Sequence, residues 1–226
     1  MEPQNIKLNS SQKEKVKSVL LEAFSEDPVF SRIFINKKEL NSFFKLAIEY
    51  VNTYGIVLAA DDITAVSLWM PPYKKFLYLG NSFRTFSLIK RSVSFIINSR
   101  LSSIFRLLSL SNFSSKNHPD SPHFYLFAIG VEKKSKGMGL GKKLMYYAFS
   151  TFGNNQAYYL ENSNFINLGF YNSLGFIHTK TSMHNDVTIY HMSKNLIWFK
   201  RIHQYETCLS AYYLKFLIYQ KNIRKN

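Results

Sequence analysis

The sequence predicts a single α/β domain, and three observations support this prediction. The chain has 226 residues, which fit one domain because single hydrophobic cores rarely outgrow about 250 residues. Hydrophobic residues make up 46% of the chain and charged residues 19%, as in globular rather than disordered proteins. Segments with helical periodicity alternate with strand-like runs, and the run from Phe124 to Val131 is apolar almost throughout, which is typical of a buried central strand.

A capping-box spacing opens the first predicted helix. Ser11 is followed three residues later by Glu14, and apolar residues then recur at helical spacing, so we expect a helix over residues 11–24. Asp27 and Pro28 interrupt this pattern. The next segments are expected to be a short apolar stretch at 30–35, an amphipathic helix through 40–51 that Gly55 ends, and a β-hairpin of 56–60 and 63–70 around Asp61 and Asp62.

Residues 74–116 predict one or two amphipathic helices, because their apolar residues group on one side and their basic residues largely on the other. After the central strand, a glycine-rich turn leads into the next helix. The remaining elements are expected to be a helix at 139–152, a strand at 157–161, a short helix at 164–174 stopped by Gly175, a closing hairpin of 176–183 and 187–193, and a final helix in 196–226.

The basic residues are concentrated in two segments of the chain. The net charge is +15, yet residues 74–116 hold eight basic residues and no acidic one, and residues 196–226 hold six basic residues and one acidic residue. An anionic partner, such as a membrane surface, a nucleic acid or an acidic substrate, would therefore meet these two segments. A solvated basic face without a partner is the other interpretation.

Composition also bounds the compartment and the cofactor chemistry. The single cysteine, Cys208, cannot form an internal disulfide or a thiolate metal cluster, and the six histidines show no metal-ligand spacing. No apolar run approaches the roughly 18 to 20 residues that span a bilayer, and the first 15 residues lack the apolar core of a signal peptide. We expect a cytoplasmic protein without a metal.

A glycine-rich segment between the predicted central strand and the next helix is the strongest sign of ligand binding. Alternating glycines let successive backbone N–H groups turn toward one concavity, where the N-terminus of a helix adds partial positive charge, so the implied ligand is a pyrophosphate. The spacing does not match a dinucleotide-binding fingerprint, and no hydroxyl follows the lysine as in a P-loop. The segment reads Lys136-Gly137-Met138-Gly139-Leu140-Gly141-Lys142-Lys143.

This segment resembles the acyl-CoA-binding loop of the GNAT N-acetyltransferases, whose pattern is Gln/Arg-x-x-Gly-x-Gly/Ala. Lys136 stands at the first position, which keeps a cation but loses the planar fork of arginine. Further segments extend the resemblance to the puromycin N-acetyltransferase-like branch, over roughly Ser10 to Leu196. These segments are Ala23-Phe24 with Asp27-Pro28-Val29-Phe30, Leu68-Trp69-Met70-Pro71-Pro72, His123-Phe124-Tyr125-Leu126, Leu160-Glu161-Asn162-Ser163-Asn164, and Asn167 with Phe170-Tyr171 and Leu174-Gly175-Phe176.

The resemblance implies a fold and a set of binding residues. The fold is a mixed, mostly antiparallel, splayed sheet with helices on both faces, in a domain of residues 1–195 followed by a basic, aromatic, helical extension at 196–226. Acetyl-CoA is the implied cosubstrate. The residues implied to hold it are Ile129, Gly130 and Val131, whose backbone pairs with the pantetheine arm, then Lys136, Gly137, Met138, Gly139, Leu140, Gly141 and Lys142 at the pyrophosphate, and Asn167 and Tyr171.

Two side chains are candidates for the chemistry itself. The resemblance places Tyr171 beside the thioester sulfur, where a phenol can protonate the departing thiolate, so Tyr171 is the candidate general acid. The amine must attack uncharged, so a carboxylate should accept its proton directly or through water, and Glu161 at the end of its strand is the candidate. A backbone N–H near Val131 is the expected oxyanion donor.

Packing and capping roles are the alternatives for the polar side chains. Tyr171 can be a packed ring whose hydroxyl bonds a carbonyl, and Glu161 can cap the helix that follows its strand. Asp27, before a proline, is more often a turn residue than a ligand of the acceptor. For His118 and His123, which flank prolines before the central strand, a structural role is favoured.

Together these residues predict transfer of an acetyl group from acetyl-CoA to a primary amine by direct attack. The resemblance places residues 74–116 over the acceptor site, and their cations and aromatic residues predict an acceptor with an apolar or aromatic body and an anionic group, or a lid that rests on anionic lipid. The alternative is a catalytically weak module of this fold that binds a membrane or nucleic acid through 74–116 and the tail. The glycine loop and Tyr171 argue against it, and no specific nucleic acid is expected.

Overall fold

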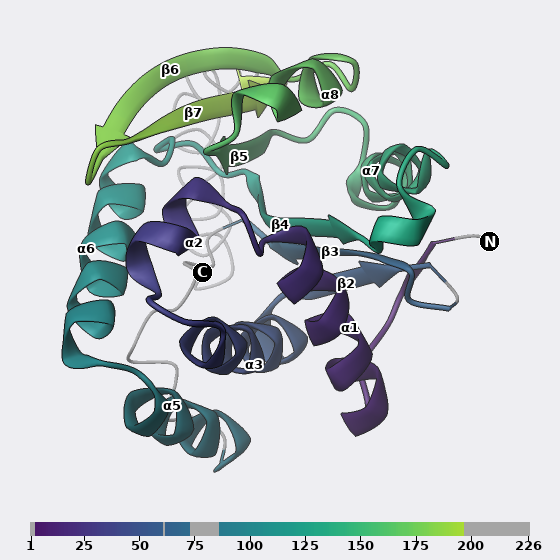
Figure 1. Cartoon of the computed structure of the whole chain (residues 1–226). Helices are drawn as coiled ribbons and strands as arrows, with labels where there is room; N and C mark the ends of the chain where they lie inside the picture. Colours follow the sequence, from purple (N-terminus) through teal and green to yellow (C-terminus); the bar gives the residue numbers. More distant parts are fainter. Residues whose placement is uncertain (1–2, 61, 73–85, 197–226) are drawn as a thin grey trace, which may run out of the picture.

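The computed structural model describes residues 3–60, 62–72 and 86–196 (Figure 1). Its centre is a seven-stranded sheet in the order β1-β2-β3-β4-β5-β7-β6, in which β4 and β5 are parallel and all other neighbours are antiparallel. The mixed, mostly antiparallel α/β fold that the sequence predicts is therefore confirmed. The strands are β1 Gln4–Asn5, β2 Ile56–Ala59, β3 Ala65–Met70, β4 Phe124–Val131, β5 Tyr158–Asn162, β6 Ile177–His184 and β7 Val187–Lys194.

Helices cover both faces of the sheet and divide the core in two. The helices are α1 Ser10–Ala23, α2 Pro28–Ile33, α3 Lys37–Tyr54, α5 Phe86–Asn98, α6 Leu101–Asn117, α7 Leu140–Phe152 and α8 Leu168–Asn172, with 3-10 turns η1 Lys133–Ser135 and η2 Phe165–Asn167. One hydrophobic core joins α1, α3 and α5 to β3, and the other joins α7 and α8 to the opposite face of the same strand. Successive side chains of β3 point to opposite faces of the sheet, so Leu68 lies in the first core and Trp69 in the second.

The predicted elements differ from the observed ones mainly at their ends. Helix α1 is capped by Asn9, whose side chain accepts from the backbone of Gln12, so the capping box predicted at Ser11 and Glu14 is wrong by two residues. The apolar stretch at 30–35 belongs to a short helix, α2, which Asp27 caps. The turn residue Asp61, residues 74–85 and the predicted helix at 197–226 lie outside the described part of the chain.

Strand β4 departs from regular pairing at one residue. Leu68 pairs with Ala128 and Trp69 with Leu126, so Phe127 is an extra residue opposite β3, which makes a β-bulge. The bulge puts the neighbouring side chains of Phe127 and Ala128 against the same core, whereas Leu126 and Ile129 contact the other one. The predicted burial of β4 on both faces is therefore incomplete: its alternate side chains are only half-buried.

The parallel strands β4 and β5 separate beyond Leu126, next to the bulge at Phe127. Strand β5 pairs with β4 from Phe124 to Leu126, whereas β3 pairs with β4 as far as Val131. Among the described strands, the β5 side of β4 beyond Leu126 therefore has no partner, and the two strands diverge as expected for a splayed sheet (Figure 1). This opening positions the site described below.

A buried carboxylate fastens the start of α6 to the core. The Oε1 of Glu39 accepts a hydrogen bond of 2.9 Å from the backbone N–H of Arg100, the residue that caps α6, and Oε2 accepts 2.8 Å from the Ser103 hydroxyl and 3.0 Å from the Ile35 N–H. Burial opposes the charge of Glu39, but these hydrogen bonds outweigh burial and lower its pKa.

Among the described residues, no helix is long and apolar enough to span a bilayer.

Candidate active site

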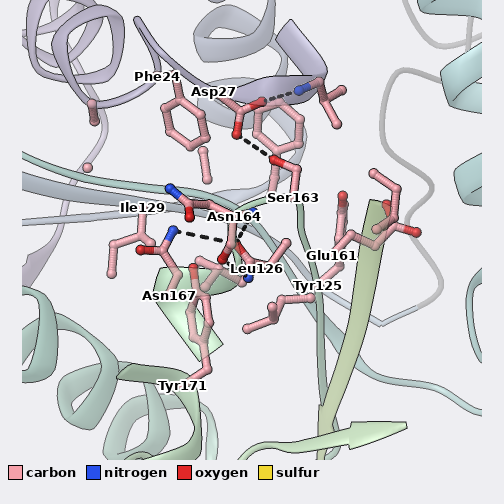
Figure 2. Close-up of a pocket in the computed structure, with 18 of the residues that line it drawn as sticks. Phe24, Asp27, Tyr125, Leu126, Ile129, Glu161, Ser163, Asn164, Asn167 and Tyr171 are labelled. Carbon is pink, nitrogen blue, oxygen red and sulfur yellow. Dashed lines mark hydrogen bonds between the residues drawn. The ribbon is translucent and has the colours of Figure 1, made fainter. Parts of the chain in front are cut away.

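A cavity of about 990 Å³ opens between the diverging ends of β4 and β5 (Figure 2). The glycine loop before α7 closes one end of it, and the α1–α2 turn and the inner side of α6 close the other. Both carboxylates and the tyrosine that bear on function line it: Asp27, Glu161 and Tyr171. The sheet thus brings residues from positions 23 to 189 of the sequence to one space.

The glycine loop has the backbone that a phosphate-binding turn requires. Gly137 and Gly139 have φ values of +82° and +75°, in the left-handed region that disfavours any side chain, and Gly139 caps α7. A Cβ built at either glycine would meet no atom within 4 Å, so the face of the loop is open. The first N–H groups of α7 point out of a helix N-terminus, where intrahelical partners are lacking.

The predicted cofactor residues gather at this cavity with one exception. Ile129, Gly130 and Val131 from the unpaired side of β4 line it, together with Asn167 and Tyr171. From the loop it is lined by Lys136, Gly137, Gly139, Leu140, Gly141 and Lys142. Met138 does not line it: its side chain is 65% exposed, and its N–H is 3.4 Å from the Ser135 carbonyl oxygen.

Gly130 lets α1 approach the β4 backbone. A Cβ at this position would lie 3.1 Å from the Ala23 Cβ and 3.2 Å from Cδ2 of Leu20, closer than most real contacts. The end of α1 is therefore held against the strand, and the turn that follows it reaches the cavity. Gly141 has a comparable position on the other side, where a Cβ would be 3.4 Å from the ring of Phe170.

Tyr171 combines a packed ring with a hydroxyl that has no partner. The ring packs edge-on against Phe170 and Phe176, with centroids 5.1 and 6.0 Å away. Its hydroxyl makes no hydrogen bond to any described residue, so the alternative of a hydroxyl tied to a carbonyl does not hold in the described structure. Burial, with the negative charge of Asp27 nearby, raises the pKa of Tyr171 above its ordinary value, so the phenol keeps its proton.

Glu161 lies in a network of hydroxyl groups. Its Oε2 accepts 2.7 Å from the Ser114 hydroxyl of α6, and its Oε1 accepts 3.1 Å from the Tyr159 hydroxyl. Burial raises the pKa of Glu161 despite these hydrogen bonds. The capping alternative is wrong, because the side chain that caps the next turn, η2, is that of Asn164.

Asp27 is a turn residue that also lines the cavity. Its Oδ1 accepts 3.0 Å hydrogen bonds from the N–H groups of Val29 and Phe30 and so caps α2. Its Oδ2 accepts 2.7 Å from the hydroxyl of Ser163, 136 residues away, and the carboxylate faces the cavity (Figure 2). Burial raises its pKa. Sequence reasoning placed Asp27 at a turn but missed that this turn lines the same cavity as Tyr171.

Helix α6 covers the cavity with small and apolar side chains. The residues that it contributes to the lining are Leu107, Leu110, Ser111, Ser114 and Ser115. We call residues 74–116 the basic segment. Its described cations do not line the cavity; they are Lys90, Arg91, Arg100, Arg106 and Lys116. Within the described part of the chain, the basic segment therefore covers the site while its charges lie elsewhere.

The comparisons with known proteins agree with this geometry. The sequence model of the acetyltransferase (GNAT) family matches residues 105–176. A search of curated proteins gives no significant match. Among solved structures, a histone acetyltransferase HPA2 and related acetyltransferase from Corynebacterium glutamicum superposes with a TM-score of 0.60 at 24% identity, over 86% of this chain and 96% of that one.

Two other structures match with lower identity. Arylalkylamine N-acetyltransferase 2 from Aedes aegypti has a TM-score of 0.56 at 16% identity, over 86% of this chain and 99% of its own. An N-acetyltransferase from Staphylococcus aureus has a TM-score of 0.54 at 13% identity, over 84% and 99%. The splayed mixed sheet with its flanking helices is the GNAT fold. The match to the family model runs from within α6 to just beyond α8 and so includes the glycine loop and Tyr171.

Proposed function

We propose that the protein is an N-acetyltransferase that transfers an acetyl group from acetyl-CoA to a primary amine. The observation that carries this proposal is the open glycine cradle at the start of α7, which faces the same cavity as the protonated, unpartnered hydroxyl of Tyr171. A reducing, cytoplasmic setting, favoured by the single cysteine, belongs to the proposal.

The residues present fit acetyl-CoA. The backbone of the loop from Gly137 to Lys142 would hold the pyrophosphate, helped by the cations of Lys136 and Lys142, because both the helix N-terminus and these side chains favour an anion. The unpaired side of β4 at Ile129 to Val131 offers backbone groups to the amides of the pantetheine arm. Acetyl-CoA supplies an activated acetyl group on a thiolate that can leave.

The transfer balances with one acid and one base from the chain. The amine nitrogen forms a bond to the acetyl carbonyl carbon, the C–S bond breaks, and the thiolate takes a proton from the Tyr171 hydroxyl. An acceptor that arrives as an ammonium first gives one proton to solvent, and the proton that the attacking amine then loses goes to a carboxylate, for which Glu161 is our candidate and Asp27 the competitor. The products are the acetamide and CoA, and the tyrosine regains its proton from solvent.

The lining favours an amine that is cationic in solution and has an aromatic or apolar body. Four carboxylate residues line the cavity, Glu26, Asp27, Asp120 and Glu161, and the described cations of the basic segment do not line it. An ammonium group would be attracted there, whereas an anionic group would be repelled. The anionic group predicted for the acceptor is therefore not part of this proposal. Apolar side chains line the same cavity, among them Phe24, Phe30, Phe43, Leu107, Leu110 and Phe127.

A second candidate function, binding to an anionic membrane, is favoured by the outer surface of α5 and α6. Phe86 and Ile97 are 82% and 75% exposed, and Leu101 and Phe105 are exposed as well, on helices whose described charges are all positive. Apolar side chains interleaved with cations are typical of helices that lie on anionic lipid. This surface does not require catalysis.

One pair of measurements separates the two functions. We expect acetyl-CoA to bind in a calorimetric titration, and thiol release to follow when hydrophobic arylalkyl amines are added, with acidic amino acids as poor acceptors. In parallel, the protein is sedimented with phosphatidylserine vesicles at increasing salt. Absence of acetyl-CoA binding together with salt-sensitive sedimentation would favour the membrane module and overturn the enzyme.

The two carboxylates are distinguished by matched amide variants. We expect Glu161→Gln to lower kcat about 100-fold or more, because an amide cannot accept the proton of the amine. Asp27→Asn keeps the oxygen that caps α2, so we expect a raised KM for the cationic amine and a smaller loss of kcat. A large loss of kcat with Asp27→Asn and a small one with Glu161→Gln would reverse the two roles.

The pH profile provides an independent measurement of the same base. A carboxylate accepts a proton only when it is ionised, so kcat should fall as the pH drops through the pKa of Glu161. Because burial raises that pKa, the fall should lie above the ordinary glutamate value of about 4.3. In Glu161→Gln this acidic limb should disappear from the profile of the residual activity.

A further inference from the structure

We propose that the proton accepted by Glu161 leaves the site through the Tyr159 hydroxyl and the His191 imidazole toward Ser182 and a second cavity. This inference rests on the proposed function, because it gives the base of that reaction a route by which it is regenerated. Tyr159 and Glu161 lie on β5, His191 lies on β7, and Ser182 lies on β6 at the edge of the sheet.

The hydrogen bonds form an unbroken line across three strands. The Tyr159 hydroxyl is 3.1 Å from Oε1 of Glu161 and 2.5 Å from Nδ1 of His191. On the far side of the ring, Nε2 of His191 is 2.5 Å from the Ser182 hydroxyl. Both ring nitrogens of a buried histidine are thus engaged, one toward the cavity and one toward the sheet edge.

The two middle members of the line, Tyr159 and His191, border a different space from the one in which the line begins. Glu161 lines the large cavity, whereas Tyr159 and His191 line a separate cavity of about 380 Å³ that Glu161 does not line. The segment from His118 to Ser121 lines both cavities and lies between them. A proton that reaches His191 has therefore left the acceptor site without passing the bound amine.

The transfer balances without an outside reactant. When Glu161 carries the proton, its O–H donates to the Tyr159 oxygen, the Tyr159 hydroxyl donates to Nδ1, and the Nε2–H donates to Ser182. If each hydrogen moves one step, the Glu161 oxygen gives up one hydrogen, the Tyr159 oxygen gains one and gives up one, and Nδ1 of His191 gains one while Nε2 gives one up. The Ser182 oxygen gains that hydrogen and releases its own as a proton to solvent, so Glu161 becomes a carboxylate again and His191 changes tautomer. Return of the ring to its first tautomer through solvent completes the cycle.

We call the line from Glu161 through Tyr159 and His191 to Ser182 the relay. Its surroundings favour the uncharged forms of Tyr159 and His191, so these two groups pass a proton on and do not retain it. Burial, with the positive charges of Lys180 and His178, lowers the pKa of His191 to about 4. Burial beside Glu161 raises the pKa of Tyr159 well above its ordinary value. The titratable or polar groups that face His191 are Tyr159 and Glu161 from β5, His178, Lys180 and Ser182 from β6, and Ser114 from α6 through Glu161.

Tyr159→Phe and His191→Gln are the decisive variants, with Tyr158→Phe as the matched control. Tyr158 is the preceding residue of β5, and its hydroxyl donates 2.8 Å to the Gly153 carbonyl oxygen, away from Glu161. We expect each relay variant to lower kcat about tenfold or more, less than loss of the base itself, while KM and acetyl-CoA affinity stay near wild type. The control should keep the wild-type kcat.

A merely structural role would not produce chemical rescue. In His191→Gly the ring is absent next to the second cavity, and we expect imidazole to raise kcat in proportion to its concentration, whereas 1-methylimidazole, which lacks an N–H, should not bridge the gap. Equal rescue by both compounds, or unchanged kcat in Tyr159→Phe and His191→Gln, would overturn the relay. If the glycine variant does not fold, the other two variants decide.

Failure of the relay and failure of the proposed function give different results. If Glu161→Gln is inactive while Tyr159→Phe and His191→Gln retain full kcat, the relay is wrong, whereas the assignment of Glu161 as the base is retained. If Glu161→Gln retains the wild-type kcat, the base is wrong and the relay loses its proton source. If acetyl-CoA does not bind the wild-type protein, the proposed function itself fails.

Discussion

Gly139→Glu is expected to weaken acetyl-CoA binding by at least about 100-fold, which corresponds to roughly 2.7 kcal/mol. Gly139 caps α7 in a left-handed conformation with φ of +75°, and its open face is where the pyrophosphate would lie. A glutamate there fills this space, places a negative charge against the phosphates and strains the backbone. Calorimetric titration with acetyl-CoA measures the effect directly.

Two variants separate the three causes of this loss. Gly139→Asn introduces a side chain that tolerates the left-handed conformation and carries no charge, so it should lose part of the affinity through bulk alone. Tyr146→Glu adds the same charge on the exposed surface of α7 and should leave acetyl-CoA affinity near wild type. Wild-type affinity in Gly139→Glu would refute the assignment of the loop to the pyrophosphate.

Tyr171→Phe is expected to lower kcat by about 100- to 10,000-fold, the usual contribution of a positioned general acid. The phenyl ring keeps the contacts with Phe170 and Phe176, so the fold and the acetyl-CoA affinity should change little. What disappears is the hydroxyl, which the described structure leaves without a partner in the cavity. Steady-state kinetics with a thiol-release assay and calorimetry with acetyl-CoA distinguish the two effects.

Tyr146→Phe is the matched control for this substitution. It removes a phenolic hydroxyl from the exposed surface of α7 and should leave kcat unchanged. If Tyr171→Phe turns over at the wild-type rate, the thiolate leaves without help from this residue. If kcat stays but the acetyl-CoA affinity falls, Tyr171 is a binding residue rather than an acid.

Local patterns in the sequence predicted the elements that they specify locally. The apolar run from Phe124 to Val131 gave both ends of β4 correctly, because a buried strand needs no more than continuous apolar character and flanking turns. The start of α1 was misplaced because Ser11 and Asn9 both have side chains that can cap a helix. Which of them does so depends on the preceding chain, where Leu8 is buried against the core.

The features that need distant partners could not be predicted in the same way. The bulge at Phe127 exists only as a register shift against β3, and no residue type in β4 marks it. The contact between Asp27 and Ser163 joins residues 136 positions apart. The cationic character of residues 74–116 suggested an anionic acceptor, which stays a prediction; of the part that the structure describes, the charged side chains do not line the cavity, whereas Leu107, Leu110 and Ser111 do.

Helix α6 is fastened at two points, and the stretch between them lines the cavity. Ser103 is hydrogen-bonded to Glu39 and Ser114 to Glu161, and the ten residues between these two anchors make about three helical turns. Leu107, Leu110 and Ser111 face the cavity from within this span and make no part of either anchor. Substitutions there would reshape the proposed acceptor pocket without disturbing the loop proposed to hold acetyl-CoA, so we expect this stretch of α6 to be the place where the choice of amine can be altered independently of the cofactor site.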